Sequence, residues 1–305
     1  MNTSQLLCKI NRLRKEKNAV ILAHNYQPPE IQKIADFVGD SFALSRAAAN
    51  TNCDIIVFCG VRFMAESAKI LSPNKIVLLP VADAGCPLAD SISVSQLQQA
   101  RSAHPKAAVV CYINTSAEVK AESDICCTSS NAVRIVQATE EEEILFVPDC
   151  NLASHVAKLV PEKKIIPWQG NCVVHSHISI ADVTAARKAH PKALLLVHPE
   201  VPAEIHAHAD FVGSTAQIIN FAAKSDCKEF IIGTEMGVLE KLRSVRPDAA
   251  FYLLQKNLLC ADMKKITLQS VYDALASMKH EVTLPKHIMK KAFECMNRMM
   301  IVAGQ

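Results

Sequence analysis

Three stretches of the sequence, AVILAHNY (19–26), AAVVCYIN (107–114) and ALLLVHPE (193–200), decide the fold. Each stretch is a short run of apolar residues that ends in polar ones, a pattern typical of a strand buried in a parallel sheet. The three stretches begin 88 and 86 residues apart. A repeat of this kind indicates that the chain contains the same structural unit three times.

The remainder of each unit follows the same plan. A short segment that begins with an aspartate follows the opening strand and passes into a helix, and these aspartates, Asp36, Asp124 and Asp210, are again 88 and 86 residues apart. Two further apolar runs then complete each unit, with helical patterns between them. These runs are DIIVFCG (54–60) and KIVLLP (75–80), ILFVPD (144–149) and KIIPW (164–168), and FIIGTE (230–235) and AFYLL (250–254).

The alternation of strands and helices predicts an α/β protein. We expect three similar three-layer αβα domains with short parallel sheets, related by pseudo-threefold symmetry around a central active site. The first domain comprises residues 1–85 plus 262–305, the second residues 86–171 and the third residues 172–261. Pro285 divides the C-terminal segment into two helices, which we expect to return to the first domain.

The composition argues against several classes of protein. Lys and Arg number 33 against 30 Asp and Glu, and a formal charge of +3 does not favour a nucleic-acid partner. No apolar run approaches the roughly 18 residues that cross a bilayer, and the N-terminal segment lacks the pattern of a signal peptide, so we expect a cytoplasmic protein without membrane contact. The chain has eight glycines and no GxGxxG or P-loop motif, which argues against a nucleotide-binding or sensing module.

One cysteine follows the fourth strand of each unit. Cys86, Cys172 and Cys260 are 86 and 88 residues apart, as three ligands around a pseudo-threefold axis would be. Three thiolates can bind zinc with one open position, or three irons of a [4Fe–4S] cluster whose fourth iron stays free. The spacing does not choose between these two sites. Gly85 and Gly170 stand just before two of the cysteines and predict tight turns where the backbone approaches a ligand.

Polar residues at the ends of the opening strands are candidates for binding and catalysis, because open α/β sheets bind ligands at the carboxyl ends of their strands. These residues are His24, Tyr26, Tyr112, Asn114, His198 and Glu200. Beside a Lewis-acidic metal a carboxylate removes protons and a phenol donates them, so Glu200 and Tyr26 are the preferred acid–base groups, with His198 as a third. His175, three residues after Cys172, is either close to the metal or at the start of a helix.

Hydroxyl residues stand where the second segment of each unit turns into a helix. They are Ser41, Ser129, Ser214 and Thr215. Each hydroxyl is suited to cap its helix. Three helix N-termini in matched positions would also direct backbone N–H groups at one point, which favours a small anion with several carboxylates or a phosphate.

Several segments closely resemble the quinolinate synthase family, in the family's order and over nearly the whole chain. They are HNYQ (24–27), GDSFALS (39–45), FMAE (63–66), DAGCPLAD (83–90), YINTSAEVKA (112–121), CCTSSNAV (126–133), HPE (198–200), DFVGST (210–215), GTEMG (233–237) and CADMKKIT (260–267). The resemblance implies an enzyme of NAD biosynthesis that condenses iminosuccinate with dihydroxyacetone phosphate to quinolinate, with loss of phosphate and water. It also implies an L-aspartate-oxidising partner enzyme that supplies iminosuccinate.

The resemblance further implies a cofactor and a set of site residues. The cofactor is a [4Fe–4S] cluster on Cys86, Cys172 and Cys260, with an open iron as Lewis acid. Tyr26 matches the family's catalytic tyrosine. The family's substrate contacts match His24, Ser41, Tyr112, Asn114, Ser129, His198, Glu200 and Thr215. An iron–sulfur hydro-lyase that acts on another dicarboxylate is the alternative function.

Overall fold

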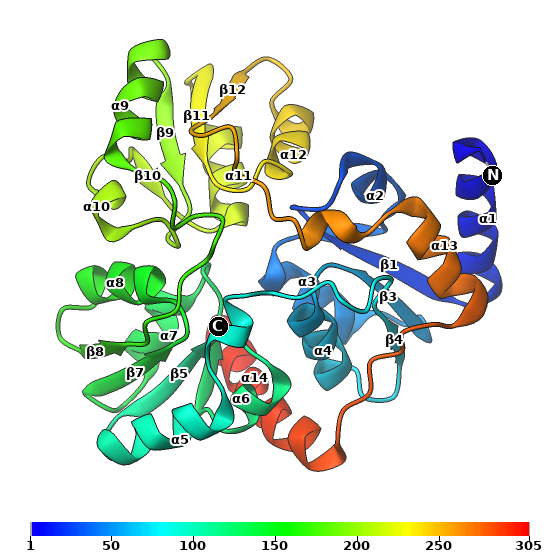
Figure 1. Cartoon of the computed structure of the whole chain (residues 1–305), viewed down its shortest axis with the longest axis horizontal. Coiled ribbons are helices and arrows are strands. Elements are labelled where there is room, and N and C mark those ends of the chain that lie inside the picture. Colours follow the sequence, from blue (N-terminus) through cyan, green and yellow to red (C-terminus); the bar gives the residue numbers. More distant parts are fainter. Residues whose placement is uncertain (1, 305) are drawn as a thin grey trace.

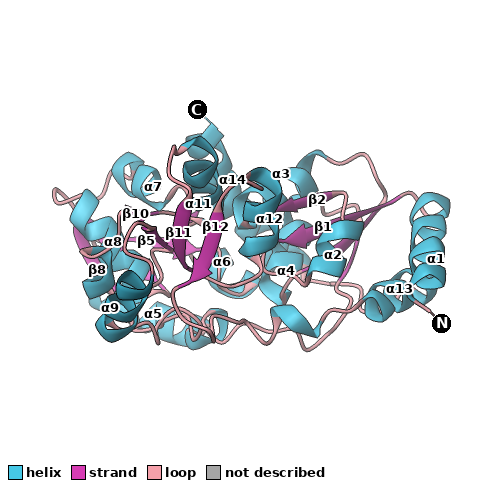
Figure 2. Ribbon diagram, turned by 90° about the horizontal axis from the view of Figure 1, so that it is seen from above, coloured by secondary structure: helices cyan, strands magenta, loops and turns pink. Residues whose placement is uncertain are grey.

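The computed structural model describes residues 2–304 and contains three similar lobes around a common centre (Figure 1). Each lobe has a sheet of four parallel strands, and the strand order is the same in all three sheets: second, first, third and fourth along the chain. Helices pack on the faces of the sheets (Figure 2). The predicted α/β fold of three units with short parallel sheets is therefore confirmed.

Apart from the short helix η1, the helices and strands of the three units correspond one to one. The first unit contains α1 (Thr3–Glu16), β1 (Ala19–His24), α2 (Pro29–Ile34), β2 (Phe37–Gly39), α3 (Ser41–Asn50), β3 (Ile55–Cys59), α4 (Arg62–Leu71) and β4 (Ile76–Leu78). The second contains η1 (Ala89–Ser91), α5 (Val94–Ala103), β5 (Ala108–Tyr112), α6 (Ala117–Ala121), β6 (Ile125–Cys127), α7 (Ala132–Ala138), β7 (Glu143–Val147), α8 (Cys150–Leu159) and β8 (Lys164–Pro167). The third contains α9 (Ile180–Ala189), β9 (Leu194–Val197), α10 (Ala203–His206), β10 (Phe211–Val212), α11 (Thr215–Lys224), β11 (Glu229–Gly233), α12 (Val238–Val245) and β12 (Ala250–Leu253), and η2 (Met263–Lys265), α13 (Leu268–Ser277) and α14 (Lys286–Gly304) follow it. As far as residues 2–304 are concerned, none of these helices has the length and apolar character of a membrane span.

The opening strands are apolar on both faces because helices cover both faces. Successive side chains of a strand point to opposite sides of its sheet. In β1, Val20 and Leu22 belong to one apolar cluster, whereas Ile21 and Ala23 belong to another on the opposite face. Every residue of β1 and of β5 is buried. This explains why the sequence shows continuous apolar runs instead of an alternation of apolar and polar residues.

A repeated aspartate holds the second strand of each unit beside the first. One carboxylate oxygen of Asp36, Asp124 and Asp210 accepts a hydrogen bond from a backbone N–H of β1, β5 and β9, at 2.8, 2.7 and 2.7 Å. In every unit an arginine from the helix before the opening strand binds the same carboxylate, at 2.6, 2.9 and 2.9 Å. The arginines are Arg14, Arg101 and Arg187. The regular spacing of the aspartates in the sequence therefore reflects a structural role that is the same in each unit.

The two C-terminal helices pack against different units. α13 packs against α1 and β3 of the first unit. α14, red in Figure 1, packs mainly against α6 and β6 of the second unit and also contacts α4 of the first. Its buried side chains include Cys295, Met296 and Met299. The structure therefore differs from the expectation that both helices return to the first unit, because the apolar stripe of α14 covers the seam between the first two units.

Candidate active site

The three units enclose one cavity on the side where the carboxyl ends of their strands meet. The cavity contains about 740 Å³ of empty space, part of it open to solvent. All three units contribute to its lining, and so do all but one of the residues that the sequence predicted for the site. These residues are His24, Tyr26, Ser41, Cys86, Tyr112, Asn114, Ser129, Cys172, His198, Glu200, Thr215 and Cys260.

Ser214 is the exception, because it does not line the cavity. Its buried hydroxyl caps α11 and accepts a hydrogen bond from the backbone N–H of Gln217 at 3.3 Å. Asp40 has the equivalent role at α3, where its carboxylate accepts from the backbone N–H of Ala43 at 3.0 Å. The capping role predicted for Ser214 is confirmed, whereas its place among the substrate contacts has no support from the geometry.

The other hydroxyl residues do not cap their helices. Ser41 and Thr215 are the first residues of α3 and α11, one position after the caps. Ser129 lies two residues before Asn131, which occupies the cap position of α7. The capping prediction was wrong for these three residues, since neighbouring residues occupy the cap positions. Their hydroxyls line the cavity instead.

His24 and His198 occupy equivalent strand ends and have the same orientation. Nδ1 of each ring accepts a hydrogen bond from the backbone N–H two residues later, from Tyr26 at 3.2 Å and from Glu200 at 3.3 Å. Burial lowers the pKa of both histidines to about 3, so both rings are neutral. A neutral ring that accepts at Nδ1 carries its proton on Nε2. The Nε2–H of His198 donates to the hydroxyl of Ser129 at 3.2 Å.

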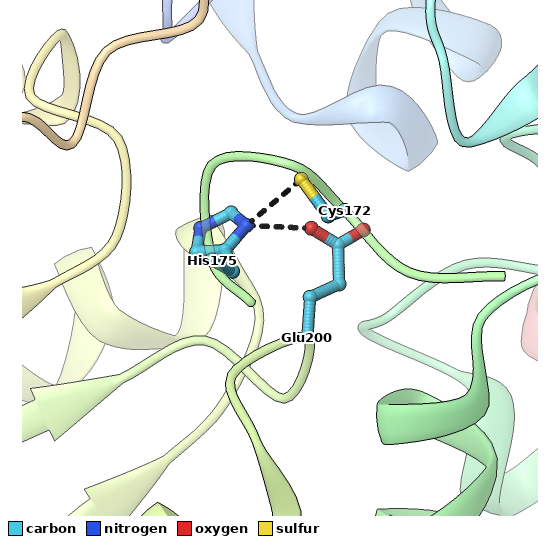
Figure 3. Close-up of side chains that lie close together, drawn as sticks. All are labelled: Cys172, His175 and Glu200. Carbon is cyan, nitrogen blue, oxygen red and sulfur yellow. Dashed lines mark hydrogen bonds and ion pairs between the residues drawn. The ribbon is translucent and has the colours of Figure 1, made fainter. Parts of the chain in front are cut away.

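A chain of hydrogen bonds joins Glu200 of the third unit to Tyr26 of the first. Nδ1 of His175 lies 2.8 Å from Oε2 of Glu200 (Figure 3), and Nε2 of the same ring lies 2.9 Å from the hydroxyl of Thr234. The hydroxyl of Tyr26 lies 2.8 Å from that of Thr234 and 3.0 Å from that of Thr215. These contacts form one continuous chain from Glu200 through His175 and Thr234 to Tyr26.

The protonation states at the two ends of this chain are opposite. Burial raises the pKa of Tyr26 well above its usual value, and the negative charge of Glu200 raises it further. Burial also acts to raise the pKa of Glu200, but His198 and His175 outweigh it and lower this pKa to about 2. At neutral pH Glu200 is a carboxylate and Tyr26 a neutral phenol. Oε1 of Glu200 and Oδ1 of Asn114 are buried and have no hydrogen-bond partner among residues 2–304, so both can bind a polar ligand.

The three predicted cysteine ligands are free thiols at the cavity. Burial raises the pKa of each, to about 12 for Cys86, and each of Cys86 and Cys172 is raised further by the charge of another cysteine of the set. Within residues 2–304 the three sulfurs do not form a group whose members all lie within 4.8 Å of one another. Ligands of a single tetrahedral ion would lie closer together. Three thiols at one cavity are compatible with an iron–sulfur cluster.

The second unit has no histidine at the end of its opening strand, and a buried lysine binds the loop that follows this strand. Tyr112 ends β5, and Asn114 follows in a loop. Nζ of Lys120 donates to the carbonyl oxygen of Ile113 at 2.8 Å and also to that of Thr115. Lys120 has no exposed surface. Its ammonium group therefore fixes the carbonyl groups of the residues before and after Asn114.

The third unit meets the first at Gly237. A Cβ at this position would lie 2.7 Å from the carbonyl oxygen of Asn25 and 2.7 Å from Cα of Tyr26. Nε2 of Gln32 donates to the carbonyl oxygens of Asn25 and Gly237, at 2.9 and 3.0 Å. The absence of a side chain at Gly237 thus allows the loop of the third unit to lie against the backbone of Tyr26.

The two glycines before the cysteines lie in different surroundings. Among the described residues no glycine has a positive φ. A Cβ at Gly85 would meet no atom of the described chain closer than 3.9 Å, and Gly85 lines the cavity, so a close approach to a ligand there stays a prediction. A Cβ at Gly170 would lie 2.4 Å from Oγ of Ser91 and 2.5 Å from the carbonyl oxygen of Pro148. The approach at Gly170 is therefore between parts of the protein.

Comparison with known families agrees with this arrangement. A family model described as NadA, Quinolinate synthetase A protein, matches residues 8–301. The chain belongs to the quinolinate synthase family. This finding confirms the resemblance drawn from the sequence motifs and the prediction of an enzyme.

Relatives named quinolinate synthase align with almost the whole chain. The protein from Alkaliphilus metalliredigens is 55% identical over 300 residues, which are 98% of this chain and 99% of the relative. The protein from Clostridium kluyveri is 57% identical over 297 residues, which are 97% of this chain and 98% of the relative. An archaeal relative, quinolinate synthase 2 from Methanosarcina acetivorans, is 49% identical over 296 residues, or 97% of this chain and 95% of the relative.

Sequence reasoning assigned no role to two important residues of this quinolinate synthase family site. Thr234 directly follows β11 and connects His175 to Tyr26, and Asp40 is a buried cap that also lines the cavity. The carboxyl end of the third strand, FIIGTE (230–235), carried the signal for Thr234, because the rule applied to the opening strands holds there too. His175 was placed either near the metal or at a helix start, and the structure puts it beside Cys172.

Proposed function

We propose that this protein condenses iminosuccinate with dihydroxyacetone phosphate to form quinolinate, phosphate and two molecules of water. Quinolinate synthesis of this kind is a step of NAD biosynthesis. Iminosuccinate would be supplied by an L-aspartate-oxidising partner enzyme, and we place the reaction in the cytoplasm. The observation that carries the proposal is the meeting, in one cavity, of three thiols, two helix N-termini and the hydrogen-bond chain between Tyr26 and Glu200.

The substrates are anions, and the cavity offers several neutral donors for them. Ser41 and Thr215 place hydroxyls at the first positions of α3 and α11, where backbone N–H groups and the helix dipole favour a phosphate or carboxylate. His24 presents its Nε2–H, because its Nδ1 already accepts from Tyr26. Neutral donors of this kind bind an anion through hydrogen bonds in a site from which most water is excluded. We assign these three residues, with Tyr112 and Asn114, to substrate binding.

Formation of the pyridine ring requires protons to leave carbon or nitrogen and to reach departing oxygen atoms. The chain from Tyr26 through Thr234 and His175 to Glu200 is suited to this task. Glu200, as the carboxylate, takes a proton from substrate, and Tyr26, as the neutral phenol, gives one to a departing oxygen atom. The chain of hydrogen bonds links these two proton transfers. His198 would assist by donating through Ser129 to bound substrate.

Cys86, Cys172 and Cys260 would hold the cofactor. A [4Fe–4S] cluster bound there would supply a Lewis-acidic iron that polarises a leaving hydroxyl. The protein's own contribution is to present three thiols, one from each unit, at the cavity. Glu235 supports the backbone of Cys260, because its carboxylate accepts a hydrogen bond from the backbone N–H of Cys260 at 3.2 Å and pairs with Lys264 at 2.9 Å.

The test is an anaerobic assay of the purified full-length protein with iminosuccinate and dihydroxyacetone phosphate. We expect quinolinate by mass spectrometry, together with a broad absorption band near about 400 nm that is lost in the Cys86→Ala variant. An intact iron–sulfur cluster without quinolinate formation would favour the alternative hydro-lyase on another dicarboxylate. A colourless protein that carries stoichiometric zinc on the three cysteines would contradict the assignment of the cofactor.

A further inference from the structure

Cys172, His175 and Glu200 form a compact group of metal-binding side chains (Figure 3). Nδ1 of His175 lies 2.8 Å from Oε2 of Glu200 and 3.2 Å from Sγ of Cys172. Within residues 2–304 this is the only group of three potential metal ligands whose atoms all lie within 4.8 Å of one another. The side chains of His175 and Glu200 are almost completely buried, with exposed fractions of 1% and 4%.

The donor atoms suit a single divalent ion of the zinc class. One sulfur, one imidazole nitrogen and one carboxylate oxygen are the three ligand types that zinc prefers. In a tetrahedral zinc site with ordinary bond lengths, such atoms lie about 3.4–3.6 Å apart. Nδ1 of His175 lies 2.8 Å from Oε2 of Glu200 and 3.2 Å from Sγ of Cys172, so these two contacts need to lengthen by roughly 0.4–0.6 Å. The ion would replace the proton that Nδ1 holds between the other two ligands.

The surroundings of His175 and Glu200 favour the same interpretation. The hydroxyl of Thr234 lies 2.9 Å from Nε2 of His175 and fixes the ring with Nδ1 toward the other two ligands. With the ion on Nδ1 a neutral ring carries its proton on Nε2 and donates it to Thr234, as the second ring nitrogen of a metal-binding histidine usually does. Oε1 of Glu200 is buried and has no hydrogen-bond partner in the described part of the chain, so it is free to share in binding the ion. All three residues line the cavity, which leaves a fourth position for water or a small anion.

We propose that the cluster-free protein binds one zinc-class divalent ion through Cys172, His175 and Glu200. Cys172 is also a proposed ligand of the iron–sulfur cluster, so the single ion and the cluster exclude each other. Only this exclusion rests on the proposed function, since the ion site itself depends on three side chains that are already together. The site gives zinc a means to block cluster assembly in this protein.

Cobalt(II) is a suitable probe, because its absorption spectrum reports both tetrahedral geometry and bonds to thiolate. We expect the full-length, cluster-free protein to bind one Co²⁺ with a tetrahedral visible spectrum and a sulfur-to-cobalt charge-transfer band. The His175→Ala and Cys172→Ala variants should bind Co²⁺ at least roughly tenfold more weakly. The Cys86→Ala variant is the matched control, because it lacks a proposed cluster ligand but keeps the ion site, and it should bind as the wild type does.

Two results would overturn the ion site. One is unchanged Co²⁺ affinity in His175→Ala. The other is loss of the charge-transfer band in Cys86→Ala, which would assign the ion to the three cysteines. Near-ultraviolet circular dichroism of each variant checks that weaker binding does not arise from unfolding. The Co²⁺ titration uses neither cluster nor substrate, so its outcome is separate from any failure to form quinolinate.

A reconstitution experiment tests the exclusion. Cluster-free wild-type protein loaded with one equivalent of Zn²⁺ should take up iron and sulfide more slowly than unloaded protein, measured by the growth of cluster absorption. The same Zn²⁺ should cause much less delay in His175→Ala. Equal delay in both proteins would show that zinc acts elsewhere. A wild-type protein that forms its cluster at the same rate with and without zinc would contradict the exclusion.

Discussion

The first and third units end their opening strands in the same way, whereas the second does not. In the first and third units a neutral histidine accepts a hydrogen bond from the backbone two residues later, and the residue at that later position is Tyr26 or Glu200. In the second unit Tyr112 stands in place of the histidine, and Lys120 holds the loop that follows. The repeated backbone thus presents side chains at three equivalent points, while the chemistry differs at each.

This comparison separates what the repeat provides from what each unit adds. The ion pair between aspartate and arginine is present in all three units, and its residues lie away from the cavity. The residues at the strand ends differ, because the reaction in one cavity requires hydrogen-bond donors, an acid and a base. Three copies of the same side chain would not supply these different functions. Four changes test this view.

The largest effect is expected at the two divergent positions, Tyr26 and Glu200. The Tyr26→Phe and Glu200→Gln variants should each lower the rate of quinolinate formation by roughly 10²- to 10⁴-fold, because each removes one end of the proton chain. The double variant should be little worse than either single one, since the two proton transfers are linked. Initial rates by product analysis measure this, with cluster absorption as the control for an intact site. Additive losses in the double variant would show that the two residues act independently.

The next largest effect is expected at Lys120, which sets the second unit apart. Replacement by Met retains an unbranched apolar stem but leaves the carbonyl oxygens of Ile113 and Thr115 without their donor. We expect the free energy of unfolding to fall by about 3 kcal/mol, since hydrogen bonds from a charged donor are worth roughly 1.5–3 kcal/mol each and a buried charge is removed at the same time.

Kinetics of the same variant separate positioning from general destabilisation. Asn114 lies between the two freed peptides, so the KM for substrate should rise more than kcat falls. The Lys120→Arg variant keeps the charge and should recover part of the substrate affinity. Urea unfolding at neutral pH gives the stability. A variant that loses stability but keeps the wild-type KM would show that Lys120 serves the core alone.

The sequence predicted the fold well because its signals are local and occur three times. The apolar strand segments follow from which side chains must be buried. The regular spacing of the aspartates and of the cysteines follows from the repetition of one structural unit around a central cavity. The packing of α14 was not predictable in this way, since its apolar stripe suits either of the two neighbouring units. The Tyr26–Glu200 chain was also hidden, because Thr234 and His175 belong to different segments that only the folded third unit brings together.

A smaller, pH-dependent effect is expected at His24. Its pKa is about 3 in the folded protein, chiefly because of burial and also because of His198 and Lys264, against roughly 6.5 in an unfolded chain. Between these values the unfolded chain binds a proton that the folded protein does not, so acidification favours unfolding. From pH 7 to pH 5 this histidine should contribute a loss of about 2 kcal/mol in the free energy of unfolding.

The His24→Gln variant measures that contribution. Its stability should fall less than that of the wild type between pH 7 and pH 5, by about 2 kcal/mol, in urea unfolding of the cluster-free protein. His287 is exposed, and His287→Gln is the matched control, expected to show the wild-type pH dependence. If the His24 variant and the wild type lose equal stability on acidification, the neutral-ring assignment at this strand end is incorrect.

The smallest effect is expected at the contact between the first and third units. Gly237→Ala places a methyl group 2.7 Å from backbone atoms of Asn25 and Tyr26, and backbone cannot move aside as a flexible side chain can. We expect a loss of about 1 kcal/mol in stability together with a lower rate, because relief of the overlap shifts Tyr26 relative to Thr234. Gly304→Ala is the matched control, since its methyl group meets nothing within 4 Å. The Gly237 contact positions Tyr26 only if the Gly237 variant, measured at a temperature where both variants are folded, is slower than the Gly304 variant. Equal rates would mean that the units meet there for stability alone.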